Sequence, residues 1–269
     1  MDLSTLIGLI LGFGAMMVAI LVEGKGDVME LTPFFQNISA FIIIIGGTFG
    51  ATMCSSKQRD MGRFFKIIGD VMKNENHDYQ SNIKLITSIA EKARREGLIA
   101  LEEDVSKIKH PFLKNGLSLV IDGVEPELIE AILITKLQEK KHEIESDAGL
   151  FETLGGFAPT MGIIGAIMGL VGALRRMGSA GMENTVEALA VAFIASFWGV
   201  AFANLLFLPI AGKVRSRWKD EHVLIQIIME GILAIQQGNN PHIVQQRLIS
   251  FLPMNGKVDM AAEEVTKES

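Results

Sequence analysis

The sequence predicts an all-α fold: a polytopic membrane protein with four transmembrane helices and an all-helical cytoplasmic domain. Three observations lead to this prediction. The chain is 49% hydrophobic and 21% charged, which is too apolar for an ordinary soluble domain and too charged for a protein that lies wholly within a membrane. The charged residues are segregated from four long apolar runs. Finally, no stretch alternates apolar and polar residues for long enough to predict a sheet.

The first two apolar runs form the first predicted region, residues 1–54. Residues 3–22 are uncharged, and about 20 apolar residues suffice for a helix to cross the bilayer core. This run is long for the apolar part of a signal peptide, and no basic residue precedes it, so we expect it to be retained. After a short polar link, the second apolar run covers residues 34–54.

The region from residue 55 to residue 147 differs in character, because it holds 15 of the 25 basic residues. Apolar residues recur there at helical spacing, which predicts a compact helical insertion. One predicted apolar face comprises Ile83, Ile86, Ile89, Ala90 and Ala93. A further helix is expected to begin at Pro126, and its predicted face comprises Leu128, Ala131, Ile132 and Thr135.

The third apolar run, residues 154–174, is uncharged over 21 residues and carries a stripe of small residues. The small residues recur at steps of 3, 4, 3, 4 and 3, which places them on one face of a helix. Such a smooth face allows close contact with another helix, and the alternative is ordinary membrane packing. The stripe consists of Gly155, Ala158, Gly162, Gly165, Gly169 and Gly172.

The fourth apolar run, residues 185–211, has a matching stripe and is joined to the third by a short link, residues 175–184. We therefore expect the two helices to pack antiparallel along their stripes, as one region spanning residues 148–211. The second stripe consists of Ala192, Ser196, Gly199 and Ala203. The residues expected to mediate the packing are Gly162, Gly165, Gly169, Gly172 and Gly199. Cytoplasmic helices are predicted for residues 212–254, and a disordered polar tail for residues 255–269.

Basic residues predict the orientation in the membrane. Residues 55–147 and the chain after residue 211 hold 22 of them, whereas the opposite side holds Lys25, Arg175 and Arg176. The positive-inside rule therefore predicts that the insertion and both termini lie in the cytoplasm.

Several classes of function find no support in the sequence. The net charge of −6 argues against nucleic acid as a main partner. One cysteine and five scattered histidines show no zinc spacing, so no metal site is predicted. No nucleophile motif or phosphate-binding loop occurs. We therefore expect no catalytic residues, no enzyme activity and no cofactor.

The four apolar runs lack an acidic or basic residue at membrane depth. A pump or transporter normally places an ionisable group there, so either no ion passes or a partner supplies the carboxylate. Hydroxyls can hand on a hydrogen bond or ligate an ion, although each can also bond to the backbone of its own helix. They belong to Thr48, Thr153, Thr160 and Ser196.

The arrangement of the four spans and three sequence segments together resemble the MotA family of flagellar motor stator subunits, which belongs with the ExbB and TolQ proteins. The three segments are APTMGIIGAIMGLVGAL, AFIASFWGVAFANLLFLPIAGKV and RREGLIALEED. The resemblance implies a homopentamer in the inner membrane around two copies of a MotB-like single-span protein, which supplies the membrane Asp. It also implies that proton flow turns the pentamer against the rotor protein FliG.

The resemblance also implies roles for individual residues. The rotor contact falls on Arg94 and Glu102. Conformational coupling falls on Pro159 and Pro209. The ion pathway falls on Pro159, Thr160, Ala166, Ala195 and Ser196. Sodium-driven relatives tend to place threonines at Ala166, Ala195 and Ser196, and an alanine methyl offers sodium no ligand. The resemblance thus favours a transported proton; the alternatives are a sodium-driven stator, an ExbB/TolQ-like energiser of outer-membrane processes, and a membrane scaffold without ion flow.

Overall fold

The computed structural model describes residues 3–73 and 78–252, apart from the side chains of residues 30, 176–188 and 191. All regular elements in these described ranges are helical. Four helical segments are long and apolar enough to cross a membrane, namely Leu3–Glu23, Ile38–Ser55, and stretches within Pro126–Arg175 and Ala192–Gln236. These segments confirm the predicted all-α class with four transmembrane helices.

The chain divides into two compact units. The first unit, which we call the membrane unit, comprises Met1–Asn74 and Ile144–Arg215. The second, which we call the charged unit, comprises Glu75–Glu143 and Ser216–Ser269. Two long helices, α10 (Pro126–Phe202) and α11 (Leu208–Gln236), contribute residues to both units.

The second span is not one uninterrupted helix. After α1 (Leu3–Glu23), the 3₁₀ turn η1 (Val28–Leu31) and α2 (Thr32–Gln36), the chain continues as α3 (Ile38–Phe41), the π-helix η2 (Ile42–Gly46) and α4 (Gly47–Ser55). The predicted helix over residues 34–54 therefore starts late. The cause is Asn37, whose side chain accepts a hydrogen bond from the Ala40 N–H at 3.2 Å and so caps a new helix.

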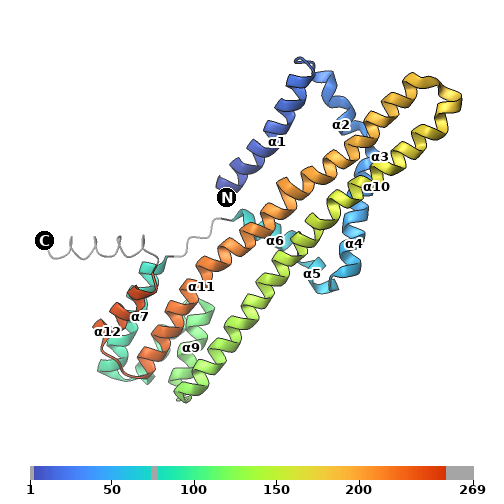
Figure 1. Cartoon of the computed structure of the whole chain (residues 1–269). Coiled ribbons are helices and arrows are strands. Elements are labelled where there is room, and N and C mark those ends of the chain that lie inside the picture. Colours follow the sequence, from blue (N-terminus) through green and yellow to red (C-terminus); the bar gives the residue numbers. More distant parts are fainter. Residues whose placement is uncertain (1–2, 74–77, 253–269) are drawn as a thin grey trace. The chain divides into compact units, whose positions relative to one another are not determined.

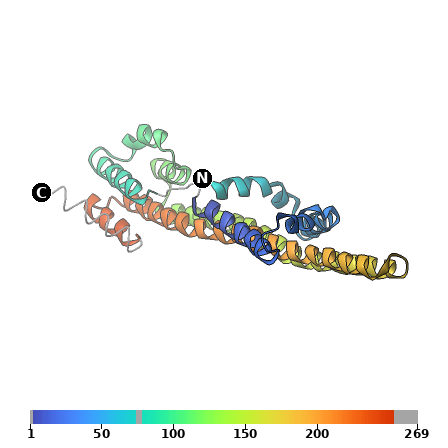
Figure 2. The same ribbon diagram turned by 90° about the horizontal axis from the view of Figure 1, so that it is seen from above.

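Helix α10 folds back on itself to form a hairpin with the π-helix η4 (Ala203–Phe207) and α11 (Figure 1). The two arms lie side by side in both ribbon views (Figure 2). Gly155 approaches Leu208, Gly162 approaches Gly199, and Gly169 approaches Ala192. Residue numbers increase along one arm as those of the contacting residues on the other arm decrease, so the arms are antiparallel. The side chains of residues 176–184, in the predicted link, lie outside the described set.

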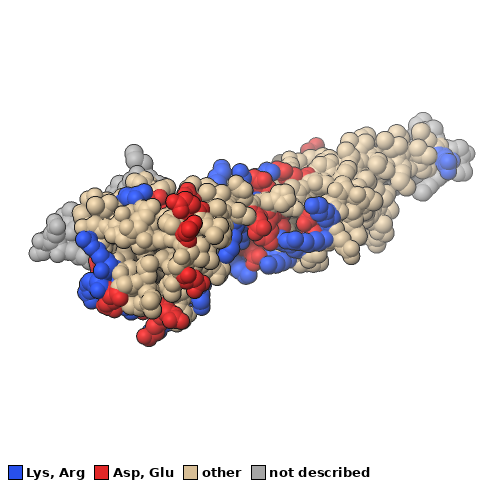
Figure 3. Space-filling view, turned by 90° about the horizontal axis from the view of Figure 1, so that it is seen from below, with Lys and Arg blue, Asp and Glu red and all other residues tan. Residues whose placement is uncertain are grey.

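Two apolar clusters hold the membrane unit together. In the first, Ile67 and Val71 of α6 (Phe64–Met72) pack with Phe151, Leu154 and Phe207 of the hairpin. In the second, the α2–η2 stretch packs on Trp198, whose indole N–H donates to the Phe34 carbonyl at 2.7 Å. On the face in Figure 3, the tan stretch just inside the grey atoms at the right-hand end shows no Lys, Arg, Asp or Glu, which is typical of a lipid-facing surface.

The charged unit is a separate helical domain with its own core. It contains α7 (Tyr79–Glu96), η3 (Ile99–Leu101), α8 (Glu102–Lys107), α9 (Pro111–Ile121) and α12 (Pro241–Ser250), besides parts of α10 and α11. Its core includes Ile83, Ile86, Leu117, Ile227 and Leu248. The predicted face of α7 is confirmed, because Ile83, Ile86, Ile89 and Ala90 are buried and Ala93 is partly buried against them.

The face predicted for the start of α10 is wrong by about one residue. Ile129 and Leu133 are fully buried, whereas Leu128 is 53% exposed. Adjacent residues of a helix lie about 100° apart, and both sets of positions are largely apolar, so the contacting helices decide which set is buried. The predicted tail, residues 255–269, lies outside the described residues.

Candidate functional site

The two arms of the hairpin touch through backbone atoms at Gly162 and Gly199. A Cβ atom added to Gly199 would lie 2.6 Å from the Ala158 carbonyl oxygen and 3.0 Å from the Gly162 Cα. One added to Gly162 would lie 2.8 Å from the Ala195 carbonyl oxygen. The two distances to carbonyl oxygens, 2.6 and 2.8 Å, are shorter than the normal contact between a carbon and an oxygen that are not bonded. Only glycine therefore fits at these two positions. We call this contact the seam.

The other stripe glycines contribute unequally to the seam. A Cβ on Gly165 would lie 3.0 Å from the Ala195 Cβ, and one on Gly169 would lie 2.6 Å from the Ala192 Cβ. An added Cβ on Gly172 would meet no atom of the described residues within 4 Å. The tight part of the seam therefore runs from Ala158 to Gly169 on one arm and from Ala192 to Gly199 on the other.

Three of the residues assigned to the ion pathway line or adjoin the seam. Ala195 is buried, at 2% exposure, and Ala166 is half-buried. The Ser196 hydroxyl donates to the Gly162 carbonyl oxygen of the facing arm at 3.4 Å. Thr160, in contrast, is exposed and its hydroxyl donates to the Phe157 carbonyl at 2.8 Å within its own helix.

The other two hydroxyls named in the sequence analysis, those of Thr153 and Thr48, do not bond across the arms. Thr153 donates to the Gly149 carbonyl of its own helix at 2.8 Å, which is the local bond considered as an alternative above. The Thr48 side chain is buried, at 1% exposure, and its hydroxyl has no hydrogen-bond partner among the described residues. Ser196 is thus the hydroxyl that bonds across two arms.

Both prolines interrupt the hydrogen bonding of a membrane helix. Pro159 lies inside α10 and has no N–H to donate to the Gly155 carbonyl. Pro209 follows the π-helix η4, in which the Leu208 N–H bonds to the Ala203 carbonyl five residues earlier. π-Turns recur at functional sites. The sequence analysis did not predict this π-helix. The one local feature that could have indicated an irregular helix there is Pro209, two residues beyond it.

Two ion pairs, which the sequence analysis did not predict, join segments of the membrane unit near the ends of the spans. Arg63, between α5 (Gln58–Gly62) and α6, donates to Asp147 of α10 at 2.7 Å. The Asp147 side chain is 7% exposed and the Arg63 side chain 20%. On the other arm, Arg215 bonds both carboxylate oxygens of Glu152, with an Nη2–Oε2 distance of 2.9 Å.

The two residues assigned to the rotor contact flank a sharp turn in the charged unit. Helix α7 ends at Gly97, whose φ of 87° is a left-handed conformation that glycine adopts readily. Arg94 lies in the last turn of α7 and Glu102 in the first turn of α8. Both side chains are exposed, and neither has an ion-pair partner among the described residues.

Their charged neighbours are paired within the chain. Arg95 contacts Glu96 at 3.3 Å, Lys107 contacts Glu103 at 2.6 Å, and Lys92 contacts Asp104 at 2.7 Å. The hydrogen bond from Lys92 lowers the pKa of Asp104, and the one from Lys107 lowers the pKa of Glu103. Arg94 and Glu102 are therefore the pair of opposite charges in this turn that is available to another protein.

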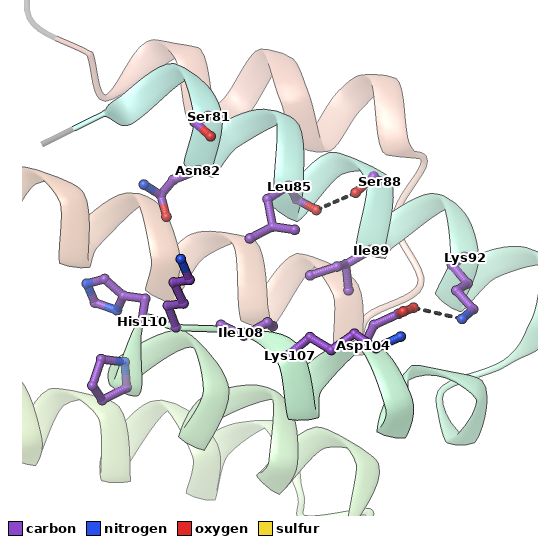
Figure 4. Close-up of a pocket in the computed structure, with 12 residues that line it drawn as sticks. Ser81, Asn82, Leu85, Ser88, Ile89, Lys92, Asp104, Lys107, Ile108 and His110 are labelled. Carbon is purple, nitrogen blue, oxygen red and sulfur yellow. Dashed lines mark hydrogen bonds and ion pairs between the residues drawn. The ribbon is translucent and has the colours of Figure 1, made fainter.

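An open pocket of about 930 Å³ adjoins this turn (Figure 4). Its walls come from α7 and from the stretch joining α8 to α9, and the Lys92–Asp104 ion pair lies at one end. Leu85 and Ile89 form apolar surface within it. The lining thus combines apolar surface with the side chains of Lys92, Lys107 and Lys109.

Comparison with known proteins places these features in context. A profile described as the MotA/TolQ/ExbB proton channel family matches residues 104–227. Motility protein A of Borreliella burgdorferi is 34% identical over 258 residues, which cover 94% of each chain. Motility protein A of Bacillus subtilis is 31% identical over 98% of this chain and 95% of its own. Chemotaxis protein PomA of Vibrio alginolyticus is also 31% identical, over 94% of this chain and 96% of its own.

Solved structures show the same similarity in three dimensions. The C. jejuni MotAB structure matches with a TM-score of 0.86 and 28% identity, over 94% of this chain and 97% of that chain. The flagellar MotAB stator complex from Bacillus subtilis matches with a TM-score of 0.86 and 30% identity, over 95% of this chain and 98% of that chain.

Proposed function

The chain belongs to the MotA/TolQ/ExbB proton channel family and is a flagellar motor stator subunit, and from this premise we propose that it couples proton flow across the inner membrane to torque on the rotor. Proteins of this family are channel and stator proteins, not enzymes. The observation that carries the proposal is the match to MotAB stators over nearly the whole chain, charged unit included. An ExbB/TolQ-like energiser is the weaker alternative for the same reason.

The chemistry of the spans supports a partner that carries the ion. The described spans offer a glycine seam and hydroxyls but no carboxylate at membrane depth. The matching structures are complexes of MotA with MotB, so a MotB-type partner belongs in the assembly. We propose that its membrane Asp binds the proton and that several copies of this chain, as a pentamer, surround it. A carboxylate held in apolar surroundings has a raised pKa and can load and release a proton.

The orientation and regions follow from the same proposal. Residues 55–147 and 212–254 would lie in the cytoplasm with both termini, because 22 of the 25 basic residues then face inward. Residues 1–54 and 148–211 would hold the four spans, and the seam would form a wall of the ion path near Ala195 and Ser196. Pro159 and Pro209 would let the arms bend as the proton passes.

The transported ion is expected to be a proton. A sodium ion needs several oxygen ligands, whereas Ala166 and Ala195 end in methyl groups and the Ser196 hydroxyl bonds to Gly162. Swimming speed should therefore be unchanged when sodium is replaced by potassium at constant ionic strength, and a protonophore should abolish swimming. Speed that follows sodium and ignores the protonophore would refute the proton assignment, while leaving the stator function intact.

The unpaired charges of the turn are proposed to contact the rotor protein FliG. Reversing both, with Arg94→Glu and Glu102→Lys, should reduce swimming at least tenfold, because partner charges would then be repelled. Stator complexes should still form in normal amounts, since neither residue has an ion-pair partner within the described chain. The measurements are swimming speed and recovery of the complex with its partner.

A matched control is Arg95→Glu, which reverses an exposed charge that lies next to Arg94 and pairs with Glu96. This variant should swim at close to normal speed. If the double reversal prevents assembly, Arg94 and Glu102 hold the fold instead of contacting the rotor.

A further inference from the structure

The outer face of α5 and α6 carries an exposed aromatic ring at the end of a membrane span. One face of α6 is buried in the membrane unit, with Ile67 at 4% and Val71 at 3% exposure. On the opposite face Phe65 is 83% exposed, the most exposed of the large hydrophobic side chains among the described residues. Beside it, a Cβ added to Gly69 would meet nothing within 4 Å. This face is therefore open, and apart from an edge contact with the Phe64 ring, at 5.2 Å between centroids, the described residues leave the Phe65 ring largely uncovered.

Exposed cations without ion-pair partners among the described residues precede and follow Phe65 in the sequence. Lys57, Arg59 and Lys66 are exposed, and no ion pair joins them to any described residue. The other basic groups nearby are engaged: Arg63 with Asp147, and Lys73 with Asp70, each at 2.7 Å. Between residues 55 and 69 the sequence has one acidic residue, Asp60. The face thus combines a net positive charge with a bare apolar anchor.

The position of this face relative to the bilayer narrows the choice of ligand. Helix α4, the end of the second span, stops at Ser55, and α5 begins at Gln58. The chain therefore has little length in which to leave the membrane surface before Phe65. A helix with one face packed on the membrane unit, an exposed aromatic side chain and flanking lysines is suited to the interface between headgroups and acyl chains.

We propose that the outer face of α5–α6 binds anionic phospholipid headgroups, with Phe65 inserted among the acyl chains and Lys57, Arg59 and Lys66 against the phosphates. Basic residues directly beyond a span attract anionic lipids. The contact anchors α6, and through Ile67 and Val71 it holds the base of the α10–α11 hairpin. This inference depends on membrane insertion and not on which ion flows, so it can fail separately from the proposed function.

The first test measures the depth of residue 65. The complete complex with its partner is reconstituted in vesicles of phosphatidylcholine and phosphatidylglycerol, with a nitroxide on Phe65→Cys in a Cys54→Ser background. The matched control is Ile99→Cys in the charged unit, since Ile99 is 78% exposed. We expect relaxation by oxygen to exceed relaxation by a water-soluble nickel chelate at residue 65, and the reverse at residue 99.

Two other outcomes would overturn the proposal. Strong relaxation by the nickel chelate at residue 65 would place the ring in water. Weak relaxation by both reagents would mean that protein, such as a neighbouring copy of the chain, covers it.

The second test measures the role of the charges. Lys57→Gln, Arg59→Gln and Lys66→Gln are combined, and the phosphatidylglycerol retained by the purified complex is compared with the retained phosphatidylcholine. Each charge removed should lower anionic lipid affinity about fivefold, so phosphatidylglycerol should be lost selectively. Lys109→Gln, an exposed cation of the charged unit, serves as the control and should change nothing. Unchanged phosphatidylglycerol in the triple variant would refute the headgroup contact.

Discussion

Replacing Gly199 with leucine is expected to abolish swimming and to prevent assembly of the stator complex. The new side chain would start 2.6 Å from the Ala158 carbonyl oxygen and 3.0 Å from the Gly162 Cα. Both are backbone atoms of the facing arm and cannot rotate away, so the whole arm would have to move. Overpacking of a core commonly costs about 1–3 kcal/mol. Because the backbone must move here, we expect a loss of stability at the upper end of this range. The measurements are complex recovery and swimming speed.

The facing stripe supplies a matched control. Gly172→Leu introduces the same side chain in the same helix, but at a position where an added Cβ meets no described atom within 4 Å. We expect this variant to assemble normally. Gly165→Leu should fall between the two, because its nearest neighbour is the Ala195 methyl at 3.0 Å. If Gly199→Leu assembles and swims normally, the seam is not a packing interface.

Replacing Asp147 with alanine is expected to destabilise the membrane unit by about 3–5 kcal/mol, because it removes one partner of a mostly buried ion pair. The control is Glu152→Ala, which breaks the Arg215 pair. Those side chains are 43% and 48% exposed, and exposed pairs contribute about 0–1 kcal/mol. Thermal unfolding of the purified complex would measure both effects, and Asp147→Ala should lower the midpoint far more than Glu152→Ala does.

A double substitution separates charge from packing. Arg63→Leu combined with Asp147→Leu removes both charges, and replacing a buried ion pair by apolar groups is often neutral. The double variant should therefore recover most of the lost stability. Equal effects of Asp147→Ala and Glu152→Ala, or no recovery in the double variant, would show that burial of this ion pair is not what stabilises the unit.

Helix class, number of spans and one core face could be predicted because each depends on local pattern. An apolar run such as residues 154–174 requires internal hydrogen bonding in lipid, which a helix satisfies by itself. The buried face of α7 was predicted correctly because Ile83, Ile86 and Ile89 recur at helical spacing with mostly polar residues between them. The α10 face near Leu128 could not be chosen in this way, since apolar residues occur on both sides of that helix.

Other features depended on which segments meet. The stripes indicated that two helices could approach, but the register that sets Gly199 against Gly162 and leaves Gly172 without a described contact is a property of the folded hairpin. The Arg63–Asp147 pair joins residues 84 positions apart, a separation at which sequence alone provides no pairing rule. The π-helix Ala203–Phe207 is followed by Pro209, whereas the π-helix Ile42–Gly46 forms with no proline beside it, so proline in the sequence does not by itself predict this feature.

The amino-acid sequence by itself determined that four helices cross the membrane, that basic charge gathers outside them, and that they contain no acid at depth to carry an ion. These properties follow from the composition of each segment and from the spacing of its apolar and charged residues, both of which can be read from one segment alone. The tertiary structure alone decided which glycines touch, which charges are paired and which, like Arg94 and Glu102, have no ion-pair partner among the described residues. Those properties depend on distances between segments, and such distances exist only once the chain has packed.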